Sequence, residues 1–293
     1  MTQPTPPAKL RSWLFAPGDS EKKMNKAADG EADVVLLDLE DAVSEASKPE
    51  ARRLVHDFLE SRDDRARLWV RINPLDGDHT LTDLAAIMPA APGGIMLPKA
   101  CGRADVERLD NYLSALEVAH GIAEGSTPVV ALVTETAAGM FATGDYRGAP
   151  RLAGMSWGAE DLADSIGAAG NTNPDGSFGY TYEMARSLCL LGAAAAGVPA
   201  IETIQADFRD LDTLRTRAEK VRRDGYRGML AIHPAQVPVI NAAFTPGAEE
   251  IAEAREIVAL FEANPDAGTI GHGGRMLDRP HLSRARQLLA QLD

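Results

Sequence analysis

Short apolar runs alternate with longer amphipathic, alanine-rich stretches along the whole chain. This alternation is typical of a parallel β-sheet covered by helices. Helical patterns separate most of the runs, for example at Ala104–His120, Tyr182–Ala196 and Leu211–Asp224. The runs predict eight strands, at Ser12–Ala16, Val34–Asp38, Leu68–Arg71, Gly94–Leu97, Val129–Thr134, Leu152–Ser156, Ala200–Thr203 and Gly228–Ile232.

These eight runs favour one closed barrel. No Pro/Gly/Ser-rich linker divides them, and 293 residues suit a large α/β barrel. We therefore expect a (β/α)8 TIM barrel as the catalytic domain over residues 1–246, and a C-terminal helical extension over residues 247–293. A doubly wound open sheet is the alternative, although it would normally have fewer strands. The extension is expected to hold a helix at Ala248–Ala263, a glycine-rich loop and a short terminal helix.

The charge and cysteine content exclude several classes of function. The formal net charge of −13 argues against nucleic acid or an anionic membrane as a partner. Cys101 and Cys189 have no second thiol nearby, so neither a disulfide framework nor a Cys-x-x-Cys zinc site is supported. The chain has no signal-peptide pattern and no apolar stretch of membrane-spanning length, and we interpret it as a cytoplasmic protein.

Charged residues gather directly after the predicted strands. In a barrel of this type the active site lies at the carboxyl ends of the strands, which we call the mouth. Such a density of charge is not needed for folding, and it indicates an enzyme. The charged residues are Asp19, Asp38, Glu40, Asp41, Arg71, Lys99, Glu135, Glu160, Asp161, Glu202 and Asp207, and the polar Asn73 and His233 lie among them.

Two of these carboxylates follow consecutive strands. Glu135 comes directly after Val129–Thr134, and Asp161 follows the next strand along the chain. Because neighbouring strand ends lie side by side in a barrel, the two can share one ion. Mg²⁺ suits them, with Mn²⁺ as the substitute, since it binds through one or two carboxylates plus substrate oxygens. The alternative is that Glu135 caps a helix and Asp161 is a helix first-turn acid.

Seven short motifs in order carry a family resemblance. They are Arg11–Gly18, Leu37–Val43, Arg71–Pro74, Met96–Ala100, the segment around Glu135, Gly158–Leu162 and Ala231–Pro234. Over nearly its whole length the chain resembles the citrate lyase β-subunit-like family of the HpcH/HpaI aldolase group, and most of all its malyl-CoA and citramalyl-CoA lyase-type members.

The resemblance implies a barrel enzyme that cleaves or forms a carbon–carbon bond beside a coenzyme A or acyl-carrier thioester. It implies that Glu135 and Asp161 bind Mg²⁺, that Glu135 also contacts the substrate, and that Arg71 binds the substrate carboxylate. A guanidinium fork can grip a carboxylate through two parallel hydrogen bonds, which agrees with that role. Glu40 and Asp41 are expected to support catalysis by orienting Arg71, metal-bound waters or the thioester.

The C-terminal segment Gly268–Pro280 adds a further implication. It looks like the segment of malyl-CoA and citramalyl-CoA lyases in which the residue matching Asp278 is the acid/base at the thioester α-carbon and reaches a neighbouring subunit's site. The resemblance thus implies a homotrimer or a hexamer built as a dimer of trimers. Without it, Asp278 would be read as a plain turn or cap residue.

The coenzyme A end of the site is expected near the first and last strands. Arg11, Lys22, Lys23 and Lys26 form the clearest basic cluster, although the lysines could equally be a solvated helix face. His233 follows the eighth strand, where barrels often bind phosphate groups, and a structural role is the alternative. Lys99 invites a Schiff-base reading, and a stabilising or coenzyme A-contacting role is favoured over it. The stretch 171–178 is either a lid or a long loop.

These features together predict an Mg²⁺-dependent carbon–carbon lyase acting on a 3-hydroxyacyl-CoA such as malyl-CoA or citramalyl-CoA, with acetyl-CoA and a 2-oxo acid as products. Three alternatives remain open. They are a citrate lyase β subunit acting on an acyl-carrier thioester, a metal-dependent aldolase for free 2-oxo-3-hydroxy acids, and a catalytically silent binding subunit.

Overall fold

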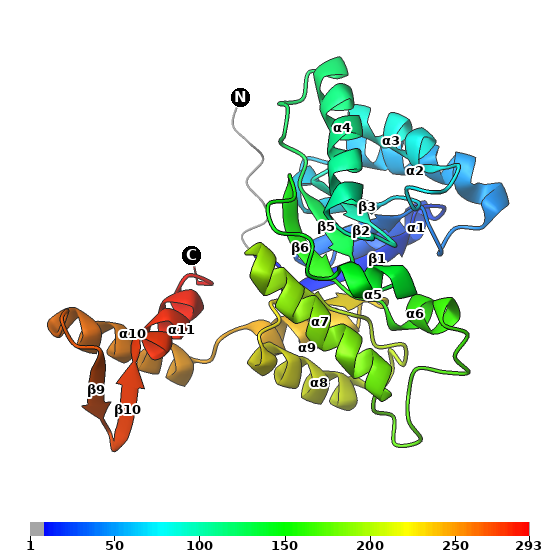
Figure 1. Ribbon diagram of the computed structural model, residues 1–293. Coiled ribbons are helices and arrows are strands. Elements are labelled where there is room, and N and C mark those ends of the chain that lie inside the picture. The colour runs from blue at the N-terminus through cyan, green and yellow to red at the C-terminus, as the bar shows by residue number, and fades with distance from the viewer. Residues whose placement is uncertain (1–8, 293) are drawn as a thin grey trace. The chain divides into compact units, whose positions relative to one another are not determined.

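The computed structural model describes residues 9–292. Eight parallel strands form a closed barrel in chain order, and β8 pairs with β1 to complete it (Figure 1). The predicted TIM-barrel class is therefore confirmed. The strands are β1 Ser12–Pro17, β2 Val34–Asp38, β3 Leu68–Arg71, β4 Gly94–Leu97, β5 Val129–Leu132, β6 Leu152–Ser156, β7 Ala200–Glu202 and β8 Gly228–Ala231.

Helices connect consecutive strands and cover the outside of the barrel (Figure 1). The expected helices are present, with bounds that differ from prediction by two residues or fewer. Those expected helices are α4 Arg103–Ala119, α7 Tyr180–Ala196 and α8 Leu211–Asp224, and the other helices around the barrel are α1 Glu21–Ala28, α2 Lys48–Glu60, α3 Thr80–Ile87, α5 Ala137–Ala142, α6 Ala159–Ser165 and α9 Gln236–Phe244.

The strands are almost continuously apolar because both of their faces are buried. In β2, Val34 and Leu36 belong to the cluster that fills the barrel, whereas Val35 and Leu37 belong to the cluster under the helices. Successive side chains of a strand point to opposite faces. The alternation therefore sends Asp38, the last residue of β2, to the same side as Val34 and Leu36, into the mouth.

A second compact unit begins at Thr245. It contains α10 Ala248–Ala263, β9 Thr269–His272, β10 Arg275–Asp278 and α11 Arg279–Leu289. Its small core is formed by Phe261, Leu277 and Leu282.

The expected glycine-rich loop of this unit is instead an antiparallel β-hairpin, so that part of the prediction is wrong. The strands β9 and β10 pair with each other, and Gly273 and Gly274 join them with φ of 55° and 74°. A two-residue hairpin turn of type I′ needs positive φ at both central residues, and glycine adopts it without steric cost.

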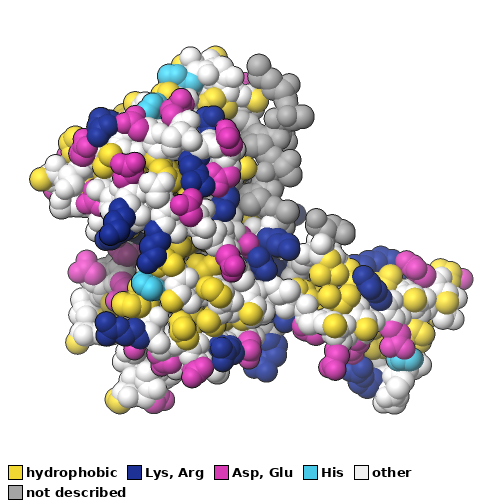
Figure 2. Space-filling view, turned by 180° about the vertical axis from the view of Figure 1, so that it is seen from behind, with side chains coloured by type: hydrophobic (Ala, Val, Ile, Leu, Met, Phe, Trp, Pro, Cys, Tyr) yellow, Lys and Arg dark blue, Asp and Glu magenta, His cyan; other side chains and the backbone are white. Residues whose placement is uncertain are grey.

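No helix in the described part of the chain is long and apolar enough to cross a membrane. On the face shown in Figure 2, acidic and basic side chains are interspersed, so the excess of negative charge is not gathered there in one patch. Cys101 is exposed, Cys189 is buried, and both are free thiols.

Candidate active site

Asp38 and Arg71 form the base of the candidate site. They end β2 and β3 and are direct register partners. The Arg71 guanidinium donates from Nε to Asp38 Oδ1 at 2.8 Å and from Nη2 to Asp38 Oδ2 at 2.6 Å. Its Nη1 atom lies 2.9 Å from Glu40 Oε2 and 3.7 Å from Asp41 Oδ2. The structure thus brings together Arg71, Glu40 and Asp41, as the sequence predicts.

Asp38 is the orienting partner that sequence reasoning left without a role. Burial alone would raise the pKa of its carboxyl, but the charge and hydrogen bonds of Arg71 outweigh that effect and hold the pKa below its ordinary value. The signal for it was available, because Asp38 and Arg71 both lie at strand ends on the side that faces into the barrel.

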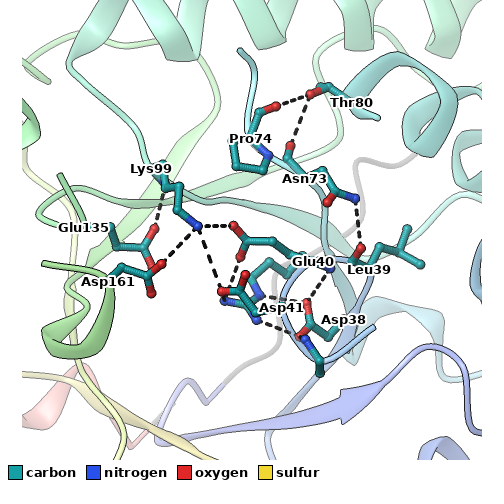
Figure 3. Close-up of polar contacts among 12 residues, drawn as sticks. Asp38, Leu39, Glu40, Asp41, Asn73, Pro74, Thr80, Lys99, Glu135 and Asp161 are labelled. Atoms are coloured by element: carbon teal, nitrogen blue, oxygen red, sulfur yellow. Dashed lines mark hydrogen bonds and ion pairs between the residues drawn. The ribbon is translucent and has the colours of Figure 1, made fainter. Parts of the chain in front are cut away.

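Lys99 connects Glu135 and Asp161 with Glu40 (Figure 3). It follows β4 with a φ of 53°, which is unusual for a residue other than glycine. Its backbone N–H donates to Glu135 Oε2 at 2.6 Å, and its ammonium lies 2.7 Å from Glu40 Oε1 and 3.0 Å from Asp161 Oδ1. Burial lowers the pKa of Lys99, but the bonds to Glu40 and Asp161 outweigh it and raise the pKa. The raised pKa favours the charged ammonium, whereas Schiff-base chemistry needs the neutral amine.

Glu135 is buried against the β6 end. A Cβ atom at Gly158 would lie only 2.8 Å from Glu135 Cγ, so glycine at this position leaves room for the Glu135 side chain. Burial, followed by repulsion from Glu40 and Asp161, raises the pKa of Glu135 to about 8. The cap of α5 is Thr136, which accepts a hydrogen bond from Gly139 N, and the reading of Glu135 as that cap is wrong.

Asp161 lies in the first turn of α6, so the helix-acid reading correctly describes its position. That position does not remove it from the mouth, because its carboxylate contacts Lys99, whose backbone holds Glu135.

The cluster has an excess of negative charge. Within residues 9–292, the cations that contact Asp38, Glu40, Asp41, Glu135 and Asp161 are Arg71 and Lys99. Among residues 9–292, no group of three or more His, Cys, Asp or Glu side chains is arranged to hold a metal. Two carboxylates that supply hard oxygen donors within this negatively charged cluster nevertheless fit Mg²⁺, which takes its remaining ligands from water and substrate.

A buried hydrogen-bond network around Lys48, which the sequence does not predict, supports the segments that carry Glu40 and Asn73. The Lys48 ammonium donates to Leu39 O at 3.0 Å, Glu40 O at 3.2 Å and Asn73 Oδ1 at 2.7 Å. Asn73 in turn donates from its backbone and side chain to Asp83 Oδ2, at 2.9 Å and 2.7 Å. These bonds tie the segments after β2 and β3 together and fix where Glu40 emerges.

One carboxylate at the strand ends does not join the site. Glu202 ends β7 with the opposite orientation and pairs with Arg217 of α8 at 2.6 Å. Alternation along the strand accounts for this, because Ile201 takes the position that faces into the barrel.

The residues expected at the coenzyme A end fall into two groups. Arg11 precedes β1 at the amino end of the barrel and holds Asp33 through Nε and Nη2 at 2.9 Å and 2.8 Å. Its assignment to the cofactor is therefore wrong, because ligands bind at the other end. Lys22, Lys23 and Lys26 lie exposed on α1, which follows the β1 mouth. His233 follows β8 and stacks on Phe208, with ring centroids 4.7 Å apart.

Asp278 is the N-cap of α11, as its cap reading predicts. Its side chain accepts from His281 N at 3.3 Å and lies 2.5 Å from His281 Nδ1, and the bond to His281 lowers the Asp278 pKa. Asp278 belongs to the second unit, and its expected role in catalysis stays a prediction.

A model of the family described as HpcH/HpaI aldolase/citrate lyase matches residues 11–234. A citrate lyase subunit beta-like protein of Mycobacterium tuberculosis is 35% identical over 277 residues, which cover 94% of this chain and 93% of the relative. A (3S)-malyl-CoA thioesterase of Cereibacter sphaeroides is 35% identical over 291 residues, which cover 97% and 95%.

Two further relatives carry named ligands or activities. The L-malyl-CoA/beta-methylmalyl-CoA lyase of Rhodobacter capsulatus is 33% identical over 314 aligned positions, which cover all of this chain and 98% of that protein. The crystal structure of CitE from Mycobacterium tuberculosis in complex with magnesium, acetoacetate and coenzyme A has a TM-score of 0.81 and 34% identity, and covers 97% of this chain and 98% of that one.

Proposed function

The chain belongs to the HpcH/HpaI aldolase/citrate lyase family, and from that premise we propose that it is an Mg²⁺-dependent carbon–carbon lyase acting on a 3-hydroxyacyl-CoA. Malyl-CoA and citramalyl-CoA are the proposed substrates, with acetyl-CoA and glyoxylate or pyruvate as products. The observation that carries the proposal is the contact of Lys99 with Glu135, Asp161 and Glu40 at one mouth, where Glu40 also contacts Arg71.

Glu135 and Asp161 are the residues proposed to hold the metal. When bound, Mg²⁺ acts as a Lewis acid that favours loss of the substrate hydroxyl proton and stabilises the negative charge on that oxygen. The magnesium named for the solved relative supports this part of the proposal.

Arg71 is proposed to fix the substrate carboxylate. Asp38 holds Nε and Nη2, so the orientation of the guanidinium is set before the substrate arrives, and Nη1 is the edge turned toward Glu40 and Asp41. Such preorganisation limits the misalignment that would slow the reaction. Glu40 and Asp41 keep Nη1 in place, which agrees with a supporting role.

Cleavage breaks the carbon–carbon bond between the hydroxyl-bearing carbon and the thioester α-carbon. The substrate hydroxyl proton is proposed to pass through water to the ionised Asp278 carboxylate, the hydroxyl oxygen becomes the carbonyl of the 2-oxo acid, and the bonding electrons pass to the thioester as an enolate. Asp278 is proposed to deliver the proton that converts this enolate to acetyl-CoA, and to remove it in the condensing direction. Its lowered pKa leaves the carboxyl ionised at rest, which suits the condensing direction.

Coenzyme A is proposed to lie over the strand ends around β8 and β1. Lys22 and Lys26 of α1 would meet its phosphates, and the stacked ring of His233 offers a flat surface beside them. Lys26 lines a groove with Pro234 and Val237, which supports the placement of α1 beside the β8 end.

A homotrimer, or a hexamer of two trimers, is the proposed assembly, in which residues 247–293 of one subunit complete the site of another. This would bring Asp278 to the mouth of a neighbouring barrel.

Hydrolysis of the malyl-CoA thioester is a second candidate, because the Cereibacter sphaeroides relatives are named thioesterases. That reaction leaves the carbon skeleton intact and gives malate and free coenzyme A.

The test is a substrate panel run with Mg²⁺ and with EDTA. The panel contains malyl-CoA, citramalyl-CoA, an acyl-carrier citryl thioester and a free 2-oxo-3-hydroxy acid. We expect Mg²⁺-dependent turnover of a coenzyme A thioester. Turnover of the carrier thioester alone would favour the citrate lyase β subunit, and turnover of the free acid alone would favour the aldolase.

A further inference from the structure

Lys99 contacts both proposed metal ligands, and it does so through two different groups. Its backbone N–H engages Glu135 Oε2 at 2.6 Å, and its ammonium engages Asp161 Oδ1 at 3.0 Å. Among the hydrogen bonds of the described residues, none reaches Glu135 Oε1 or Asp161 Oδ2. One oxygen of each carboxylate is thus occupied by Lys99, and the other is left for a ligand.

The backbone of Lys99 is held in the conformation that makes both contacts. Its φ of 53° lies in the left-handed region, which is costly for a long side chain and persists where the surroundings impose it. Figure 3 shows the ammonium between Asp161 on one side and Glu40 on the other. The cation therefore stands inside the carboxylate cluster and not at its rim.

We propose that Lys99 is a built-in counter-ion of the metal site, whose ammonium offsets the carboxylate charge and makes divalent-metal binding weaker than Glu135 and Asp161 alone would give. This inference rests on the proposed metal site. A metal ion bound to Asp161 lies within a few ångströms of the ammonium, and the two positive charges repel each other. Like the metal, the ammonium is attracted to Asp161, so the two cations compete for the same carboxylate.

Tight metal binding should then require the substrate. With an ammonium opposing it and only two carboxylate oxygens available, the ion depends on additional oxygen ligands for tight binding. The acid end of the substrate supplies negatively charged oxygens. Binding of the acid and of the metal should therefore strengthen each other, and the coupling is reciprocal. Lys99 would then keep the site from retaining metal firmly in the absence of substrate.

The test measures Mn²⁺ binding to the full-length protein by the electron paramagnetic resonance signal of free Mn²⁺. Two variants remove the ammonium. Lys99→Met preserves much of the side-chain volume, and Lys99→Gly retains the backbone N–H to Glu135 while suiting the positive φ. Lys22→Met removes an exposed lysine of α1 and is the matched control for net charge. Circular dichroism checks the fold of each variant.

We expect the Kd for Mn²⁺ to fall at least tenfold in both Lys99 variants and to change less than twofold in Lys22→Met. A tenfold change corresponds to about 1.4 kcal/mol. An unchanged or higher Kd in either folded Lys99 variant would overturn the proposal. If the wild type shows Mg²⁺-dependent turnover while the variants bind no more tightly, only this inference fails. Tighter binding by the variants without turnover by the wild type would overturn the proposed reaction instead.

Discussion

Arg71 combines a structural role with its proposed role in binding the substrate carboxylate. It is buried, and so are two of the carboxylates it pairs with, Asp38 and Glu40. Removing one partner of a buried ion pair leaves the other charge desolvated without compensation, which costs about 3–5 kcal/mol.

We therefore expect Arg71→Met to lower the free energy of unfolding by about 3–5 kcal/mol, as measured by urea denaturation. Arg53→Met is the control, because the Arg53 pairs with Glu50 and Asp57 are exposed. Its unfolding should match that of the wild type. Equal stability of the two variants would show that the Arg71 pairs contribute nothing.

The raised pKa values of Glu40 and Glu135 predict how stability depends on pH. Burial is the main cause, and it raises the pKa from 4.5 to about 7 for Glu40 and to about 8 for Glu135. A carboxyl with a raised folded-state pKa binds a proton more tightly when folded. Its contribution is therefore complete below the unfolded value and is lost as the pH rises through the folded one.

In EDTA, we thus expect the unfolding free energy to fall between about pH 5 and pH 8, as followed by urea denaturation at several pH values. Glu135→Gln should flatten part of this slope. A metal-free wild type whose stability rises throughout that interval would contradict the assigned environment of the two carboxyls.

Side-chain positions at the mouth could be predicted only in part. Arg71, Glu135 and Asp161 follow predicted strands, and strand ends of a barrel converge, so their meeting could be inferred. The two contacts of Lys99 depend on a backbone angle that composition does not reveal. The bonds of Lys48 to carbonyl groups are equally hidden, because they require the paths of two loops.

Gly158, in the turn between β6 and α6, sets the position of the Glu135 side chain. It begins the turn from β6 into α6, and its missing side chain is what accommodates Glu135. An added Cβ would lie 2.8 Å from Glu135 Cγ, closer than van der Waals contact permits, so Glu135 would have to move.

We expect Gly158→Ala to weaken Mn²⁺ binding and to lower turnover by at least tenfold, while the circular dichroism spectrum stays unchanged. The comparison variant is Gly144→Ala, where a Cβ would meet nothing within 4 Å. If both variants bind Mn²⁺ equally well, the close packing of Glu135 on Gly158 has no bearing on the metal.

Elements with strong periodicity could be predicted from sequence, and short exposed ones could not. Tyr182–Ala196 was expected as a helix, and the structure extends it by one turn or less to Tyr180–Ala196. The sequence does not predict the hairpin of β9 and β10, because its strands have four residues each and Leu277 is their one buried residue, which is too little for an alternating pattern. Gly273 and Gly274 between them were the available signal.

At the scale of the whole molecule, the barrel and the second unit carry different parts of the proposed chemistry. The proposed metal ligands Glu135 and Asp161 belong with Arg71 to the first unit, and Asp278 belongs to the second, which begins at Thr245. The sequence predicts the boundary between the two units after residue 246. The role of residues 247–293 is implied by the family resemblance.

Subunit mixing tests whether the second unit serves a neighbouring barrel. Glu135→Ala and Asp278→Ala should each be inactive alone. Co-expressed in equal amounts, they should regain up to about a quarter of wild-type turnover. Half of the barrels in a randomly assembled oligomer keep Glu135, and half of the neighbouring second units keep Asp278, so about one site in four has both. No gain over the separate variants would mean that Asp278 does not act in trans.

The most direct test of the proposed reaction is the product ratio from malyl-CoA with Mg²⁺, quantified by mass spectrometry. A carbon–carbon lyase gives acetyl-CoA and glyoxylate in equal amounts, and EDTA abolishes both. We predict that result for the wild type and its loss in Glu135→Ala. Malate and free coenzyme A as the only products, or cleavage that persists unchanged in EDTA, would contradict it.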